Sequence, residues 1–156
     1  RVWFTKANSG SLSLETVNQT CGSSFGDTVE VDLRIIDASQ PVDAAGVDIP
    51  YPGDFVYVGY KRGDLTTAWP FFDAADLGSA VRVGGFSDTP IAGGSSGVFV
   101  TLRFVLHCCE GASGDWLCPQ AAVDDFAGMT TTCGYVTCVP LATRPSTWGY
   151  VKSIYR

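Results

Sequence analysis

Two segments in which apolar and polar residues alternate constrain the fold of this chain more than any other feature. The first follows Gly26 and covers residues 28–37, where Val, Leu and Ile alternate with Glu, Asp and Arg. The second begins at Gly97 and ends at Leu106. A period of two residues is that of a half-buried β-strand. Because several shorter segments of the same kind lie between them, the sequence predicts an all-β fold, a two-sheet antiparallel β-sandwich.

The remaining strands are expected in shorter stretches of the chain. They are predicted at residues 12–16, 45–51, 55–60, 80–86, 116–123 and 135–141. Residues 64–80 show no clear period and residues 87–97 are rich in turn formers, so both are expected to be connections. Pro145-Ser146-Thr147 predicts the start of a short C-terminal helix or turn. We expect one domain over residues 1–156, with an N-terminal strand extension at 1–10 and a C-terminal tail at 141–156.

The charge balance argues against two classes of partner. The chain has 16 acidic and 10 basic side chains, a formal net charge of −6. Nucleic acids are bound by basic side chains that replace counterions on phosphates, and anionic membrane surfaces attract basic segments. The longest apolar run, residues 98–106, is interrupted by Thr101 and Arg103 and is far shorter than the roughly 20 residues of a transmembrane helix. We therefore expect neither nucleic-acid binding nor membrane insertion.

Six cysteines favour disulfide bonds and an oxidising compartment. They are Cys21, Cys108, Cys109, Cys118, Cys133 and Cys138. We favour Cys133–Cys138 as a hairpin link and Cys109–Cys118 as a loop closure, which leaves Cys21–Cys108 as the third pair. The chain begins at Arg1 with neither a methionine nor an apolar leader. We therefore expect the mature form of a secreted protein, located outside the cell or at the cell surface.

The order and content of these segments resemble the cohesin family. The resemblance rests on Gly26-Asp27-Thr28-Val29, on Leu65 and Trp69 followed by residues 81–87, and on the closing strand at 97–104; it covers roughly residues 11–140. It implies a jelly-roll sandwich related in fold to carbohydrate-binding modules. Well-studied cohesins bind dockerin modules through one sheet face in cell-surface assemblies, so the resemblance implies a dockerin-like partner. The six cysteines and the two terminal segments depart from the family pattern, and we transfer no partner-contact residue.

No constellation of residues predicts catalysis, and we expect no enzymatic activity. The single histidine, His107, would have to serve in any Ser/His/Asp or Cys/His mechanism. A histidine at the end of a strand, beside disulfides, is the favoured interpretation.

Two groups of residues offer metal ligands, but we expect no cofactor. His107, Cys108, Cys109 and Cys118 could hold zinc, although the usual Cys-x2-Cys pairs are missing and disulfides are favoured. Four acidic residues could supply oxygen ligands for calcium, although their spacing is not that of an EF-hand. These are Asp73, Asp76, Asp124 and Asp125.

The densest aromatic cluster is formed by Trp69, Phe71 and Phe72. Such rings could stack on a glycan or anchor a protein partner. We favour a loop that covers one end of the core, and keep the binding site as the alternative.

The two ends of the chain suggest assembly. Val2, Trp3 and Phe4 precede an expected flexible hinge at residues 8–10, and a strand on a hinge can pair with the sheet edge of a neighbouring molecule. Near the other end, one helical stripe is formed by Trp148, Val151, Ile154 and Tyr155. We therefore predict a non-catalytic extracellular structural module that self-associates with copies of itself into a filament or surface polymer. The alternatives are a protein-binding module for a dockerin-like partner and a glycan-binding module.

Overall fold

The structure is a computed structural model, and it describes residues 7–20, 27–106 and 114–137. The described strands are β1 Ser11–Thr20, β2 Asp27–Ile36, β3 Val42–Pro50, β4 Phe55–Arg62, β5 Phe71–Asp76, β6 Ala80–Ile91, β7 Gly97–Leu106, β8 Asp115–Leu117, β9 Gln120–Asp124, β10 Thr130–Thr132 and β11 Gly134–Val136. Within these ranges there is no helix that is long and apolar enough to cross a membrane. The predicted C-terminal helix or turn lies outside the described residues.

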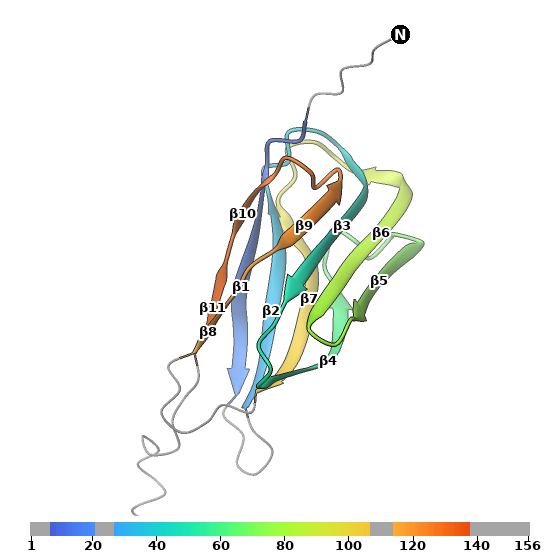
Figure 1. Cartoon of the computed structure of the whole chain (residues 1–156). Coiled ribbons are helices and arrows are strands. Elements are labelled where there is room, and N and C mark those ends of the chain that lie inside the picture. The colour runs from blue at the N-terminus through green and yellow to red at the C-terminus, as the bar shows by residue number, and fades with distance from the viewer. Residues whose placement is uncertain (1–6, 21–26, 107–113, 138–156) are drawn as a thin grey trace, which may run out of the picture.

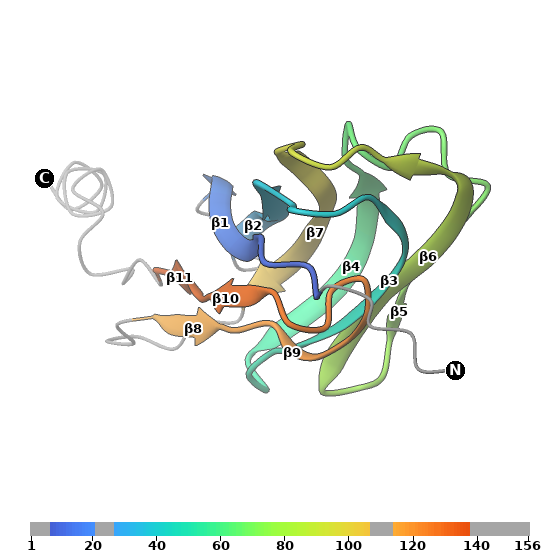
Figure 2. The ribbon, with the colours of Figure 1, turned by 90° about the horizontal axis from the view of Figure 1, so that it is seen from above.

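The strands form two packed sheets and a short ladder (Figures 1 and 2). The five-stranded sheet has the order β10-β1-β2-β7-β4, and the four-stranded sheet has the order β5-β6-β3-β9. Strands β8 and β11 pair with each other beside β1. All pairings are antiparallel except that of β10 with β1. The predicted two-sheet antiparallel β-sandwich is confirmed.

The two alternating segments are neighbours in the middle of the five-stranded sheet. Strand β2 pairs with β7 from Asp27 opposite Leu106 to Ile35 opposite Gly97. Four apolar residues of β2 are buried between the sheets, together with Phe99 and Phe104 of β7: Val29, Val31, Leu33 and Ile35. Because alternate side chains point to opposite faces of a strand, Glu30, Asp32 and Arg34 lie on the outer face.

Several strands differ from the sequence prediction. Strand β5 lies in residues 64–80, where a connection was expected, and β6 continues to Ile91 into the expected turn region. Strand β5 is an edge strand that pairs only with β6, and only its Phe72 and Ala74 turn toward the core. Its apolar–polar alternation is therefore too short to predict a strand from the sequence. The predicted strand at 116–123 is two strands, because the chain passes from the β8–β11 ladder to the four-stranded sheet at residues 118–119.

The expected hinge at residues 8–10 is wrong for a physical reason. Asn8 is buried, and its side-chain Oδ1 accepts a hydrogen bond from the Ser39 backbone N–H at 2.9 Å while its Nδ2 donates to the Gln40 carbonyl at 3.2 Å. The Gly10 carbonyl accepts a hydrogen bond from the Thr130 N–H. A Cβ atom at Gly10 would lie 2.8 Å from the Ala38 Cα, so only glycine fits there. This segment is docked on the connection between β2 and β3.

The described disulfide joins Cys118 to Cys133. Cys133–Cys138 and Cys109–Cys118 are therefore wrong, and Cys118 is not available as a zinc ligand. The register of β8 and β11 explains the pairing: Leu117 is opposite Gly134, so the next residue of one strand and the preceding residue of the other also meet, with Cα atoms 4.3 Å apart. The predicted Cys21–Cys108 pair lies outside the described residues.

Candidate functional site

An aromatic row crosses the outer face of the four-stranded sheet. Phe71 of β5 lies opposite Phe86 of β6, which in turn lies opposite Ala44 of β3. The two rings stack with centroids 4.4 Å apart and planes 18° apart, yet they are 57% and 54% exposed. Exposed aromatic residues are typical anchors of protein interfaces.

A glycine row runs beside the aromatic row on the same face. Gly84 of β6 lies opposite Gly46 of β3, and these are flanked by Asp73 on β5 and Val123 on β9. Neither glycine has a positive φ, so what distinguishes them is the missing side chain. Glycine inside a strand commonly marks a place where another backbone approaches closely. The sheet surface is low at Gly84. Beside Gly46 the Val123 side chain, which is 52% exposed, takes up the space, since a Cβ atom on Gly46 would lie 2.9 Å from the Val123 Cγ2.

A shallow depression of about 340 Å³ adjoins the glycine row. It lies between β3 and β9, where the register shifts after Gly46 and Ala121 adopts a φ of 51°. Its far wall is the ion pair of Arg82 with Asp48, in which two guanidinium nitrogens donate to the two carboxylate oxygens at 2.9 Å each. The arginine hydrogen bonds hold the pKa of the Asp48 carboxyl below its usual value. The face therefore combines apolar rings, a flat centre and one fixed polar group.

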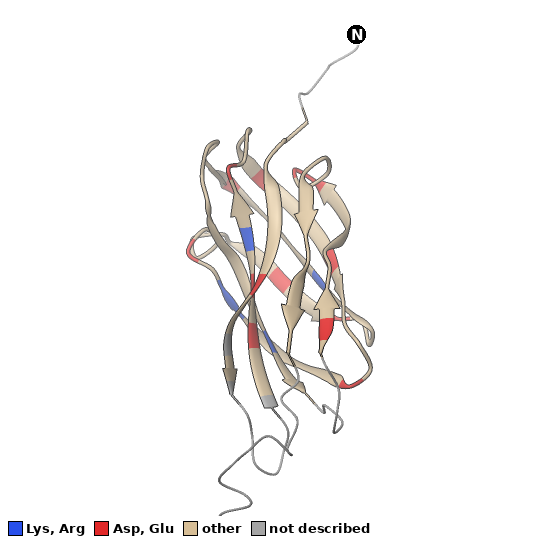
Figure 3. Cartoon of the chain, turned by 90° about the vertical axis from the view of Figure 1, so that its left-hand side faces the viewer, with Lys and Arg blue, Asp and Glu red and all other residues tan. Residues whose placement is uncertain are grey.

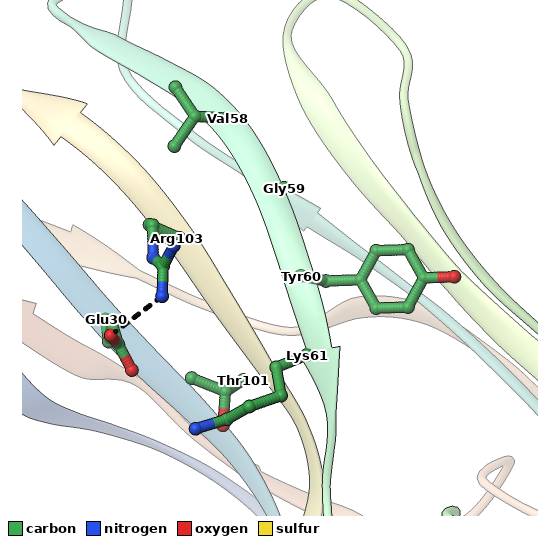
Figure 4. A pocket seen from close by; sticks show the side chains of 7 residues that line it. All are labelled: Glu30, Val58, Gly59, Tyr60, Lys61, Thr101 and Arg103. Carbon is green, nitrogen blue, oxygen red and sulfur yellow. Dashed lines mark hydrogen bonds and ion pairs between the residues drawn. The ribbon is translucent and has the colours of Figure 1, made fainter.

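The outer face of the five-stranded sheet has a different character. Its charged side chains bond to one another across the strands: Arg34 with Glu15 at 3.8 Å and Arg103 with Glu30 at 3.2 Å. Figure 3, a view from the left-hand side of Figure 1, shows basic and acidic residues interspersed along the strands. A hollow of about 190 Å³ on this face is lined by the Glu30–Arg103 pair and Lys61 among others. Figure 4 shows these side chains. Most of these charges are satisfied by one another, which makes this face the weaker candidate for an anchor.

The structure separates the predicted aromatic cluster. Trp69 is only 3% exposed and packs edge-on against Phe99, with ring centroids 5.5 Å apart, so it cannot stack on a glycan. Phe72 also contacts Phe99 and lies under the Arg62 guanidinium at 5.6 Å. Only Phe71 points outward. The favoured interpretation, a loop that covers one end of the core, fits Trp69 at most, because Phe71 and Phe72 belong to strand β5.

The acidic calcium candidates do not come together. Within the described residues there is no group of three or more His, Cys, Asp or Glu residues placed to hold a metal ion. Asp125 accepts hydrogen bonds from the backbone N–H groups of Asp43 and Ala44, and raises the pKa of the Asp43 carboxyl by its hydrogen bond and its charge. Asp76 accepts a hydrogen bond from the Tyr51 hydroxyl at 2.5 Å. These contacts do not support the calcium alternative, and the absence of a cofactor stays a prediction.

Other predicted site residues lie outside the described residues. They are His107 and the assembly candidates Val2, Trp3, Phe4, Trp148, Val151, Ile154 and Tyr155. Self-association through the chain ends therefore stays a prediction.

The sequence reasoning missed Phe86, Gly84 and Gly46 as surface residues. A signal was present in residues 81–86, where Arg82, Gly84 and Phe86 alternate with buried valines and a second glycine. An aromatic residue on the polar side of an alternating strand indicates a binding surface, because exposed aromatic residues are typical of interfaces. The partner strands of this row could not be inferred, because the register across the sheet is not local in sequence.

Comparisons with known proteins give the fold. No protein-family profile and no curated protein sequence matches the chain. A non-cellulosomal cohesin from the hyperthermophilic archaeon Archaeoglobus fulgidus is 14% identical with a TM-score of 0.61, over 91% of this chain and 97% of that one. CaCohA2 from Clostridium acetobutylicum is 20% identical with a TM-score of 0.59, over 85% and 93%. The cohesin of the OlpC type I cohesin–dockerin complex from Clostridium thermocellum is 14% identical with a TM-score of 0.60, over 88% and 100%. The chain therefore has a cohesin-like jelly-roll fold.

Proposed function

We propose that this chain is a non-catalytic protein-recognition module that binds a dockerin-like partner through the outer face of the four-stranded sheet. The observation that carries the proposal is the exposed Phe71–Phe86 stack beside the glycine row of Gly46 and Gly84. Aromatic anchors beside a flat centre suit a partner whose backbone lies close to the sheet.

The fold comparison favours a dockerin-like occupant over a copy of the chain. The cohesin from OlpC was solved as a complex with a dockerin, and this chain matches it over most of its length. The self-assembly prediction, in contrast, depends on terminal residues outside the described ranges. The Cys118–Cys133 disulfide supports an extracellular or cell-surface location, since such bonds persist in oxidising compartments.

The proposal is tested by biolayer interferometry of the full chain against a panel of immobilised dockerin modules. The informative variant is Phe71→Ala/Phe86→Ala, because truncating interface anchors typically costs about 2 kcal/mol or more, which is about 30-fold in affinity. The matched control is Val56→Ala/Val58→Ala, which truncates two exposed residues on β4 of the other sheet.

We expect at least one dockerin to bind the unmodified chain and the control variant, and the phenylalanine variant to bind about 30-fold more weakly. Circular dichroism and thermal unfolding verify that both variants are folded. Failure of every dockerin to bind, or equal loss in the control variant, contradicts the proposal.

A further inference from the structure

A second aromatic surface lies far from the four-stranded sheet, on the β8–β11 ladder. Trp116 of β8 is directly opposite Tyr135 of β11, and their ring centroids are 4.9 Å apart with planes tilted by 59°. Trp116 is 63% exposed, the largest value among the exposed large apolar residues of the described chain. Figures 1 and 2 show this ladder beside β1, on the opposite lateral side of the sandwich from β5.

The contacts of the β8–β11 ladder with the rest of the sandwich fix the position of these two rings. Their strand neighbours Leu117 and Val136 are fully buried, so alternation along the strands turns Trp116 and Tyr135 outward. The Cys118–Cys133 disulfide closes the ladder at one end. The Tyr135 carbonyl accepts a hydrogen bond from the Thr16 hydroxyl at 3.0 Å, which ties the ladder to β1. A surface fixed in this way loses little conformational entropy when a ligand binds.

The fold does not require an exposed indole at this position. The ladder is already anchored by its two buried side chains, the disulfide and the hydrogen bond from β1. Gly134 fits tightly against β1 as well, since a Cβ atom there would lie 2.6 Å from the Leu14 carbonyl oxygen. Tryptophan and tyrosine offer a large apolar face together with a polar edge, which suits a ligand that is itself partly polar.

The size of the surface and its surroundings point to a carbohydrate. The exposed area of two rings is far smaller than the roughly 800 Å² that each partner of a stable protein complex contributes. It is similar to the area of one or two sugar rings. Exposed Thr130, Thr131 and Thr132 precede the ladder on β10, with only Cys133 between them and β11. At about 3.3 Å per strand residue, the backbone of Thr132 lies within about 10 Å of that of Tyr135, and alternation turns Thr130 and Thr132 to one side of β10 and Thr131 to the other. The net charge of −6 disfavours acidic polysaccharides.

We propose that Trp116 and Tyr135 form a stacking platform for a pyranose ring of a neutral oligosaccharide, with the threonine hydroxyls of β10 beside it. The apolar C–H face of the sugar lies on the indole, and its hydroxyl groups face the threonines and water. This site is independent of the proposed dockerin-binding face.

The test is isothermal titration calorimetry of the full chain with cello-, xylo-, manno- and chito-hexaose. At least one sugar is expected to bind the unmodified chain, and Trp116→Ala is expected to weaken that binding at least tenfold. Trp116→Phe keeps a ring across from Tyr135 and preserves the ladder if the alanine variant fails to fold; it is expected to bind several-fold more weakly. The matched control is Phe86→Ala, which removes an exposed ring from the other surface and is expected to leave sugar binding unchanged.

Absence of binding to all four sugars overturns the proposal, as does binding that both Trp116 variants leave unchanged. If Trp116→Ala abolishes dockerin capture while no sugar binds, the ring pair belongs to a protein interface and the carbohydrate assignment is wrong. If Phe86→Ala loses dockerin capture but keeps sugar binding, the result concerns only the proposed dockerin face. The two proposals can therefore fail separately.

Discussion

At the scale of single residues, the position of an aromatic ring decides its role. Trp69 and Trp116 are the same residue type, but one is 3% exposed against Phe99 and the other is 63% exposed. The sequence does not distinguish them: Trp69 stands in a segment without a clear period, Trp116 begins a predicted strand, and each has an apolar neighbour. Burial depends on which strands pair with those segments, and this is fixed only in the folded chain.

Trp69→Ala should therefore lower the free energy of unfolding far more than Trp116→Ala does. Removing a buried tryptophan costs about 3–5 kcal/mol through lost burial and the cavity left behind. Removing the exposed ring costs only its cross-strand contact, about 0.2–1 kcal/mol. Urea denaturation of the two variants measures both free energies. Equal losses of stability would contradict the placement of the two residues.

Tyr51 gives a prediction about high pH. Its ring is partly buried against Phe104 and its hydroxyl donates to Asp76; burial first, then the carboxylate, raises the pKa of Tyr51 to about 12. Since the raised pKa favours the neutral phenol in the folded state, the associated stability is complete below about pH 10 and is lost as the pH rises through about 12.

Tyrosinate absorbance after rapid pH jumps measures this value when the unmodified chain is compared with Tyr51→Phe. The difference between the two titrations reports Tyr51, because the remaining tyrosines are common to both proteins. A midpoint near pH 12 is expected, and a midpoint near pH 10, the ordinary tyrosine value, would contradict the contact with Asp76 and the burial of the ring.

At the scale of elements, the segment between Cys118 and Cys133 links the two sheets. It contains β9, an edge of the four-stranded sheet, and β10, an edge of the five-stranded sheet. The disulfide joins the two ends of this segment to each other at one end of the β8–β11 ladder. Val123 of β9 belongs to the candidate partner face, so the disulfide also supports that face.

Cys118→Ser/Cys133→Ser should destabilise the chain by about 3 kcal/mol, the value expected for a closed loop of about 15 residues. Amide hydrogen exchange should become faster in β9 and β10, while β2 and β7 in the middle of the sheet stay protected. Substitution is the sharper test than reduction, because it leaves the other cysteines unchanged. Unchanged exchange in β9 and β10 would show that the disulfide does not hold these edges.

The sequence predicts the central strands well and the edges poorly. Strands β2 and β7 show period-two patterns because each buries one full face. Strands β5 and β10 have few or no buried side chains, so their patterns carry no such signal. The disulfide partners were missed for a related reason: Cys118 and Cys133 meet through the register of β8 with β11, which spacing along the chain does not reveal.

At the scale of the whole molecule, the sandwich presents two unlike outer faces. The five-stranded sheet carries charged side chains that pair with one another, and the four-stranded sheet carries stacked rings, paired glycines and a shallow depression. The resemblance to cohesins, visible in the sequence, leads to the correct fold. The residues of the candidate face were not predicted, because they come from four strands whose order differs from their order in the chain.

The central claim is that the partner covers the four-stranded sheet. It is tested most directly by NMR chemical-shift mapping of the 15N-labelled chain bound to a dockerin module that it captures. We expect the largest shifts at the amides of Gly46, Gly84 and Phe86, with Val56 and Arg103 on the opposite sheet nearly unchanged. Shifts concentrated on β4 and β7, with the Gly46 and Gly84 amides unmoved, would contradict the account.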